Sequence, residues 1–186
     1  YREQKNYPKA IAILERVVAK FPDNDRYRFT LGATLDEAND RDRAIVEMER
    51  AIAINPKNAA ALNYLGYTYA DMGVKLDQAE ALVRRALAID PDDGFYIDSL
   101  GWVYFKRGEY GRAIEYLEQA AELAGQDPTI VEHLGDAYRQ TGQGDSALQS
   151  YREALGQSKD AAQVERLKNK IHGIGDGIRA DGAPRS

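Results

Sequence analysis

Small and large apolar residues recur along this chain with a period of 34 or 35 residues. A Leu-Gly pair stands at positions 31–32, 65–66, 100–101 and 134–135. An alanine follows each glycine by twelve or thirteen residues, and a second alanine comes seven residues later. Residues three or four apart share a helix face, and helices cross closely only where side chains are small. The pattern therefore predicts pairs of helices that touch at glycine and alanine.

Glycine, asparagine and proline mark the ends of these predicted helices. A residue suited to the left-handed helix end lies between the two helices of each pair, at Asn39, Gly73, Gly108 and Gly142. Proline, which cannot continue an outgoing helix, closes several of the units, as at Pro56. A large residue stands three positions after each glycine and is expected to fill the space between hairpins; these are Leu35, Tyr69, Tyr104 and Tyr138.

The period, the small-residue positions and the closing prolines resemble the tetratricopeptide repeat over about residues 1–160. The resemblance implies an all-α fold, a right-handed superhelical solenoid of antiparallel helix hairpins. The expected repeats are 25–58, 59–93, 94–127 and 128–161, after the second helix of an incomplete repeat at 1–24. A capping helix is predicted at 162–172 and a flexible tail at 173–186. Arg28 departs from the pattern, because the family often has a large apolar residue there.

Composition narrows the range of functions. The net charge of -5 argues against nucleic acid as a partner, because phosphate binding needs a basic surface. The sequence has no cysteine, which excludes disulfides and thiolate sites. No apolar run reaches the length of a membrane span. His133 and His172, the only histidines, are expected to have surface or packing roles, and we expect no metal site and no cofactor.

In proteins of the family that the chain resembles, the first helices of successive hairpins line a concave groove. The resemblance implies a protein or peptide partner in that groove. Position by position, the predicted binding residues are Asn63, Tyr67, Asp71, Phe95, Asp98, Trp102, Lys106, Glu132, Asp136 and Arg139. Large aromatic residues of this kind anchor interfaces. The groove positions carry more acids than bases, so we expect a partner with apolar side chains and basic or neutral flanks. The alternative for Trp102 and Phe105 is packing between hairpins.

Three functions are compatible with this pattern. The first is an interaction scaffold or adaptor, and the sequence has no constellation that indicates an enzyme. The second is a self-assembling repeat module that associates through the N-terminal end, where no cap is visible. The third rests on residues 96–104, which resemble a stretch of large bacterial repeat proteins. Some of those are envelope lipoproteins that bring a protease to its substrates. This resemblance implies a bacterial protein of the cytoplasm or of the periplasmic side of the envelope.

Overall fold

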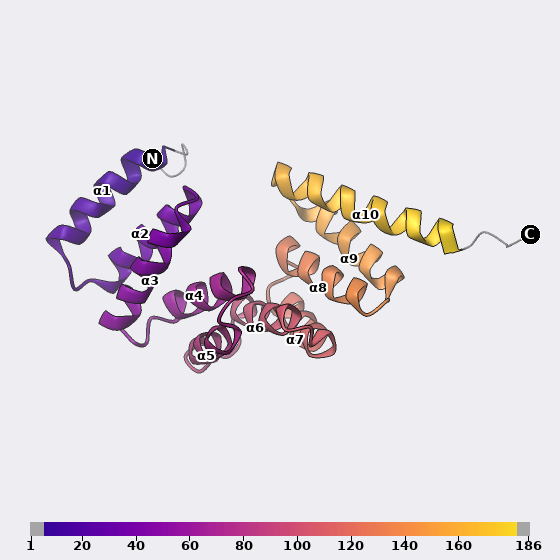
Figure 1. Cartoon of the computed structure of the whole chain (residues 1–186), viewed down its shortest axis with the longest axis horizontal. Coiled ribbons are helices and arrows are strands. Elements are labelled where there is room, and N and C mark those ends of the chain that lie inside the picture. Colours follow the sequence, from indigo (N-terminus) through magenta and orange to yellow (C-terminus); the bar gives the residue numbers. More distant parts are fainter. Residues whose placement is uncertain (1–5, 182–186) are drawn as a thin grey trace, which may run out of the picture. The chain divides into compact units, whose positions relative to one another are not determined.

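The computed structural model describes residues 6–181, with side chains up to residue 174, and all of its regular structure is helical. The helices within these residues are α1 (Tyr7–Lys20), α2 (Asp25–Glu37), α3 (Arg41–Ile54), α4 (Ala59–Asp71), α5 (Leu76–Leu87), α6 (Gly94–Lys106), α7 (Tyr110–Leu123), α8 (Pro128–Gln140), α9 (Gly144–Gln157) and α10 (Ala161–Asp181). Figure 1 shows them as consecutive hairpins. Among the described residues, no helix is both long and apolar enough to span a membrane.

Local signals set where the helices begin and end. Each first helix of a hairpin follows an Asn or Asp whose side chain accepts a hydrogen bond from a backbone N–H of the first turn; these residues are Asn24, Asn58, Asp93 and Asp127. At the other end, the residues predicted to take the left-handed conformation do so. The φ angle is 63° at Asn39, 68° at Gly73, 80° at Gly108 and 77° at Gly142. The turn between the two helices of each hairpin is therefore determined locally.

The described helices form two compact units, the first with helices α1 to α5, which ends at residue 91, and the second with helices α6 to α10, which begins at residue 92. In the first unit, α2 packs against α3 and α4 against α5, with α1 on α2 and α3 on α4. In the second unit, α6 packs against α7 and α8 against α9, while α7 contacts α8 and α10 contacts α9. In both units the core lies between the two helices of each hairpin as well as between successive hairpins.

Glycine and alanine provide the close helix contacts in these cores. The repeated alanines are fully buried, as at Ala51 and Ala120. Of the large residues that follow the glycines, Leu35, Tyr69 and Tyr104 are buried as predicted. Tyr138 is different, because its ring is only half-buried and its hydroxyl donates a hydrogen bond to Glu118.

The end of the chain differs from the expectation of a helix that stops at residue 172. Helix α10 continues to Asp181, through Gly173, Gly175 and Gly177. Glycine lowers helix propensity by about 1 kcal/mol per residue but does not remove a backbone donor, and proline first occurs at position 184. The buried side chain of Ile174 also holds the helix past the predicted end. The rest of the predicted tail, 182–186, lies outside the described residues.

Candidate peptide-binding surface

In the first unit, the predicted binding residues lie on α4. Asn63, Tyr67 and Asp71 are four residues apart, so they follow one stripe of the helix, and all three are half-buried. The side-chain oxygen Oδ1 of Asn63 is buried and accepts no hydrogen bond from any residue that the structure describes. The Asp71 carboxylate lies 3.3 Å from Nη1 of Arg41, whose Nε is also 3.3 Å from Asp36. The acidic end of this stripe is thus partly neutralised within the unit.

In the second unit, α6 carries the aromatic stripe of Phe95, Trp102 and Phe105. Phe95 is 53% exposed, whereas Trp102 is only 8% exposed. The Trp102 ring is stacked between two neighbours: Phe105, at a centroid distance of 4.6 Å, and His133 of α8, at 4.1 Å. Nζ of Lys106 lies 5.0 Å from the Trp102 ring centroid. Of the two roles considered for Trp102, packing between hairpins is the one that this geometry supports.

Asp98, expected on the surface of the groove, is buried instead. Its carboxylate lies 2.8 Å from Nδ1 of His133, which joins α6 to α8. Burial disfavours the charged imidazolium, but the Asp98 carboxylate outweighs that effect and raises the pKa of His133. His133 therefore has the packing role expected of it, through an ion pair that its position in the sequence does not reveal.

Two further predicted acids, Glu132 and Asp136 of α8, are covered by α10. Arg166 donates two hydrogen bonds to Glu132, from Nε at 2.7 Å and from Nη2 at 2.9 Å. Nζ of Lys170 lies 2.8 Å from Glu132 and 2.7 Å from Asp136. Burial acts to raise the pKa of Glu132, but these bonds and one from Gln163 lower it to about 2. In the last hairpin, α10 therefore packs against the residues that were predicted to line the groove. Of the three predicted binding residues on α8, only Arg139 is exposed.

The matched spacing of these charges was visible in the sequence. Arg166 and Lys170 are four residues apart, as are Glu132 and Asp136, so two helix faces of opposite charge can meet in register. The acids that are in excess at the groove positions are mostly neutralised within the chain, because most of them contact a basic side chain of the same unit. The acids that do so are Asp36, Asp71, Asp98, Glu132 and Asp136.

The tetratricopeptide repeat family matches the sequence over residues 99–162 and, in two overlapping segments, over residues 1–48 and 37–100. A TPR repeat-containing protein of Pseudomonas aeruginosa is 29% identical over 128 residues, which make up 69% of this chain and 22% of that protein. The chain thus spans about a fifth of the length of this relative.

Solved structures with a similar fold include a thermophilic TPR protein of Thermus thermophilus, with a TM-score of 0.78 at 23% identity over 91% of this chain and 93% of that one. The type IV pilus biogenesis factor PilW has a TM-score of 0.78 at 18% identity, over 100% of this chain and 90% of its own. PilF of Pseudomonas aeruginosa has a TM-score of 0.71 at 19% identity, over 98% and 88%. At these identities the likeness concerns the fold.

Proposed function

Because the chain belongs to the tetratricopeptide-repeat family, we propose that it is an interaction scaffold that binds a protein or peptide partner through its first helices. Repeat proteins of this kind present extended surfaces to partners and are in general scaffolds rather than enzymes. No catalytic role is proposed for any residue of this chain.

The observation that carries this proposal is the exposure of Phe95. This side chain leaves about half of its surface in water and is the most exposed member of the aromatic stripe on α6. Trp102 and Phe105, stacked on each other, give that stripe a rigid base. A rigid aromatic patch next to an exposed ring is typical of the anchors that carry most of the free energy of binding in interfaces.

The side chains proposed to contact the partner are Tyr67 and Asp71 on α4 in the first unit, and Phe95, Lys106 and Arg139 in the second. We expect the partner to supply apolar side chains at Phe95. Since most of the acids on the first helices are paired within the chain, the flanks of the partner are expected to be neutral rather than strongly basic.

Affinity capture with the immobilised chain, followed by mass spectrometry, tests this proposal. Phe95→Ala should reduce recovery of the captured partner about tenfold or more, as removal of an interface anchor does. Leu123→Ala is the matched control, because Leu123 is a similarly exposed apolar residue, 48% exposed, on the second helix α7 of the same unit. Equal recovery with both variants and the unchanged chain would contradict binding through the first helices.

Self-assembly is a second candidate, supported by the apolar residues that α1 exposes. Ile13 of this helix and Phe21, which follows its last residue, are each 45% exposed. Light scattering over a range of concentrations distinguishes the two functions. A mass that stays at one chain eliminates self-assembly and leaves the scaffold proposal intact, whereas a mass that rises with concentration favours self-assembly.

A further inference from the structure

A hollow of about 430 Å³ lies on one face of α1 in the first unit. Among the described residues, its lining combines three apolar side chains, Ile13, Val17 and Phe21, with two bases, Arg16 and Lys20, and includes no acid. We call it the α1 hollow. The four lining residues within the helix are three or four positions apart, so they share one side of α1. None of the residues proposed above to contact a partner lines this hollow.

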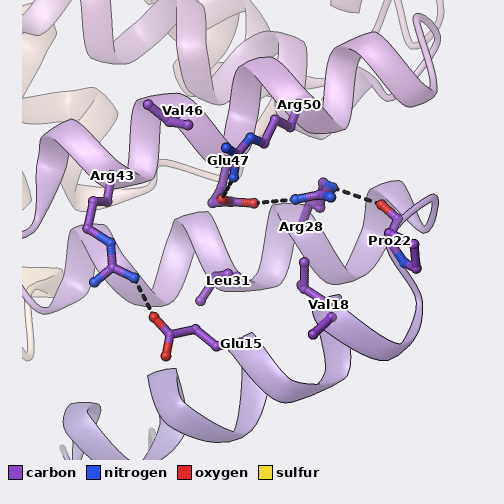
Figure 2. Close-up of a pocket in the computed structure, with 10 residues that line it drawn as sticks. Glu15, Val18, Pro22, Arg28, Leu31, Arg43, Val46, Glu47 and Arg50 are labelled. Carbon is purple, nitrogen blue, oxygen red and sulfur yellow. Dashed lines mark hydrogen bonds and ion pairs between the residues drawn. The ribbon is translucent and has the colours of Figure 1, made fainter.

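Another side of α1 is occupied within the first unit. Val18 lies in one buried cluster with Leu31 of α2, and Glu15, the one acid of α1, is bonded to Arg43 of α3 (Figure 2). Among the described residues, no member of α2 or α3 lines the α1 hollow. The hollow is therefore a separate face of the helix.

In every later hairpin, the equivalent face of the second helix is covered by a first helix. Val17 stands where those second helices have an alanine, and each of these alanines is fully buried; they are Ala51, Ala86, Ala120 and Ala154. Their helices pack against α2, α4, α6 and α8 in turn. On α1, by contrast, Val17 is half-buried and Ile13 is 45% exposed. The face thus has the apolar pattern on which a helix packs, and no described helix covers it.

Larger apolar residues distinguish this face from the contacts within the hairpins. Valine replaces alanine at position 17, and Phe21 stands where the later units have Asn55, Asp90, Ala124 and Ser158. The distance between packed helices depends on the side chains at their contact, so a helix on this face lies farther away than a first helix does from its partner. The α1 hollow therefore suits large aliphatic side chains rather than the Leu-Gly pair of a first helix.

The two bases of the hollow are available to an acidic ligand. Arg16 and Lys20 are both exposed, and neither forms an ion pair with any residue that the structure describes. Nζ of Lys20 lies 5.4 Å from the ring centroid of Phe21, so a positive charge adjoins the apolar part of the lining. The second unit shows how such a spacing is matched. There, two bases of α10 four residues apart meet two acids of α8 with the same spacing, Arg166 on Glu132 and Lys170 on Asp136.

We propose that the α1 hollow binds an acidic amphipathic helix of a partner protein. Its aliphatic side chains would contact Ile13, Val17 and Phe21, and two of its carboxylates, four residues apart, would meet Arg16 and Lys20. The volume lies within the range of about 300–1,000 Å³ that is common for ligand pockets. This site is on a different unit from the aromatic stripe of α6.

Charge argues against two other occupants. A second copy paired α1 to α1 would bring Arg16 and Lys20 toward the same bases of its partner, and the lining supplies no acid to offset their repulsion. Recognition of an anionic membrane surface typically uses a cluster of about four to eight bases, whereas the hollow has two.

Methyl NMR of the whole chain tests the proposal, with the blocked helical peptide acetyl-AELLAELAAELLAEA-amide as the probe. Saturable shifts are expected at the methyl groups of Ile13 and Val17. The matched peptide with lysine in place of every glutamate should bind about tenfold more weakly or worse. Ile89, an isoleucine of the same unit that is 40% exposed, is the control within the sample and should not respond. Equal binding of the two peptides, or no response at Ile13 and Val17, would overturn the proposal.

Charge reversal tests the two bases. Arg16→Glu with Lys20→Glu should weaken binding of the acidic peptide about tenfold or more. Arg152→Glu with Lys168→Glu changes the net charge equally at exposed bases of the second unit and should leave binding unchanged. An equal loss in both double variants would show that only net charge acts and would contradict the assignment. Because the readout is at Ile13 and Val17, its failure leaves the proposal for Phe95 untouched.

The same methyl groups report the other two occupants. Phosphatidylglycerol vesicles that shift Ile13 and Val17, when the acidic peptide does not, would show a membrane-binding face and contradict the proposal. Shifts that grow with the concentration of the chain alone would also contradict it, because a second copy would then fill the hollow.

Discussion

The tightest contacts at the scale of single residues fall on the glycines of the first helices. A Cβ atom on Gly66 would lie 2.6 Å from Cγ2 of Val83 and 3.0 Å from the carbonyl oxygen of Ala79. The carbonyl oxygen belongs to the backbone of α5, so it cannot move aside without a shift of the helix. Glycine is required here by the approach of the two helices, even though alanine is the better helix former.

We predict that Gly66→Ala lowers the free energy of unfolding by about 1–2 kcal/mol, because the cost of overpacking exceeds the gain in helix propensity. Gly111→Ala is the matched control, since a Cβ atom there would meet nothing within 4 Å. That substitution should be neutral or stabilise the chain by up to about 1 kcal/mol. Urea denaturation measures both values. Effects of the same sign and size would show that Gly66 is not at a tight contact.

The buried pair of His133 and Asp98 predicts a dependence of stability on pH. Because the folded chain raises the pKa of His133 above its ordinary 6.5, the protonated histidine stabilises the fold fully below pH 6.5. That stability is lost as the pH rises through the pKa of the folded state. His133→Gln should therefore cost about 1–2 kcal/mol at pH 6 and progressively less at higher pH. A constant difference in unfolding free energy between pH 6 and 9 would contradict this account.

At the scale of elements, the last helix of the second unit, α10, is joined to α8 by ion pairs. Arg166 and Lys170 meet Glu132 and Asp136 at 2.7–2.9 Å. The carboxylate of Glu132 is almost completely buried, so the contact with α10 is what makes its charge tolerable there.

We predict that Glu132→Gln increases the exchange rates of the α10 backbone amides about tenfold or more, as measured by hydrogen exchange. Glu165→Gln, an exposed acid of the same helix, should leave them unchanged. The effect should also depend on pH. The Glu132 pKa falls from an ordinary 4.5 to about 2, so its contribution is complete above pH 4.5 and is lost as the pH falls toward 2. If the variant and the parent chain do not converge in stability in acid, the ion pair is not the cause.

Much of this architecture was predictable from sequence, because its signals are local. A left-handed residue such as Gly108 and a small residue such as Ala120 act within one hairpin, and their spacing alone indicates the fold. The environment of a first-helix side chain depends instead on which residue of another helix meets it. The contacts of His133 with Trp102 and of Arg166 with Glu132 are of this kind. Because of them, Trp102 and Glu132 are buried although they were expected to line the groove surface.

At the scale of the whole molecule, each unit presents its own set of exposed side chains. The first has Arg43 and Arg50 of α3 about half-exposed and the α4 stripe half-buried, and the second has Phe95 and Arg139 exposed with Lys106 half-buried. Most acids on the first helices are paired internally. The proposed scaffold is therefore expected to recognise its partner mainly through apolar contact rather than through the net charge of -5.

Site-specific photocrosslinking during partner capture tests this account most directly. A photoreactive phenylalanine derivative is placed at position 95 on α6 or, as the control, at position 123 on α7, which carry similarly exposed apolar residues. If the first helices bind the partner, position 95 should yield a crosslinked partner and position 123 should not. A crosslink from position 123 with none from position 95 would contradict binding through the first helices.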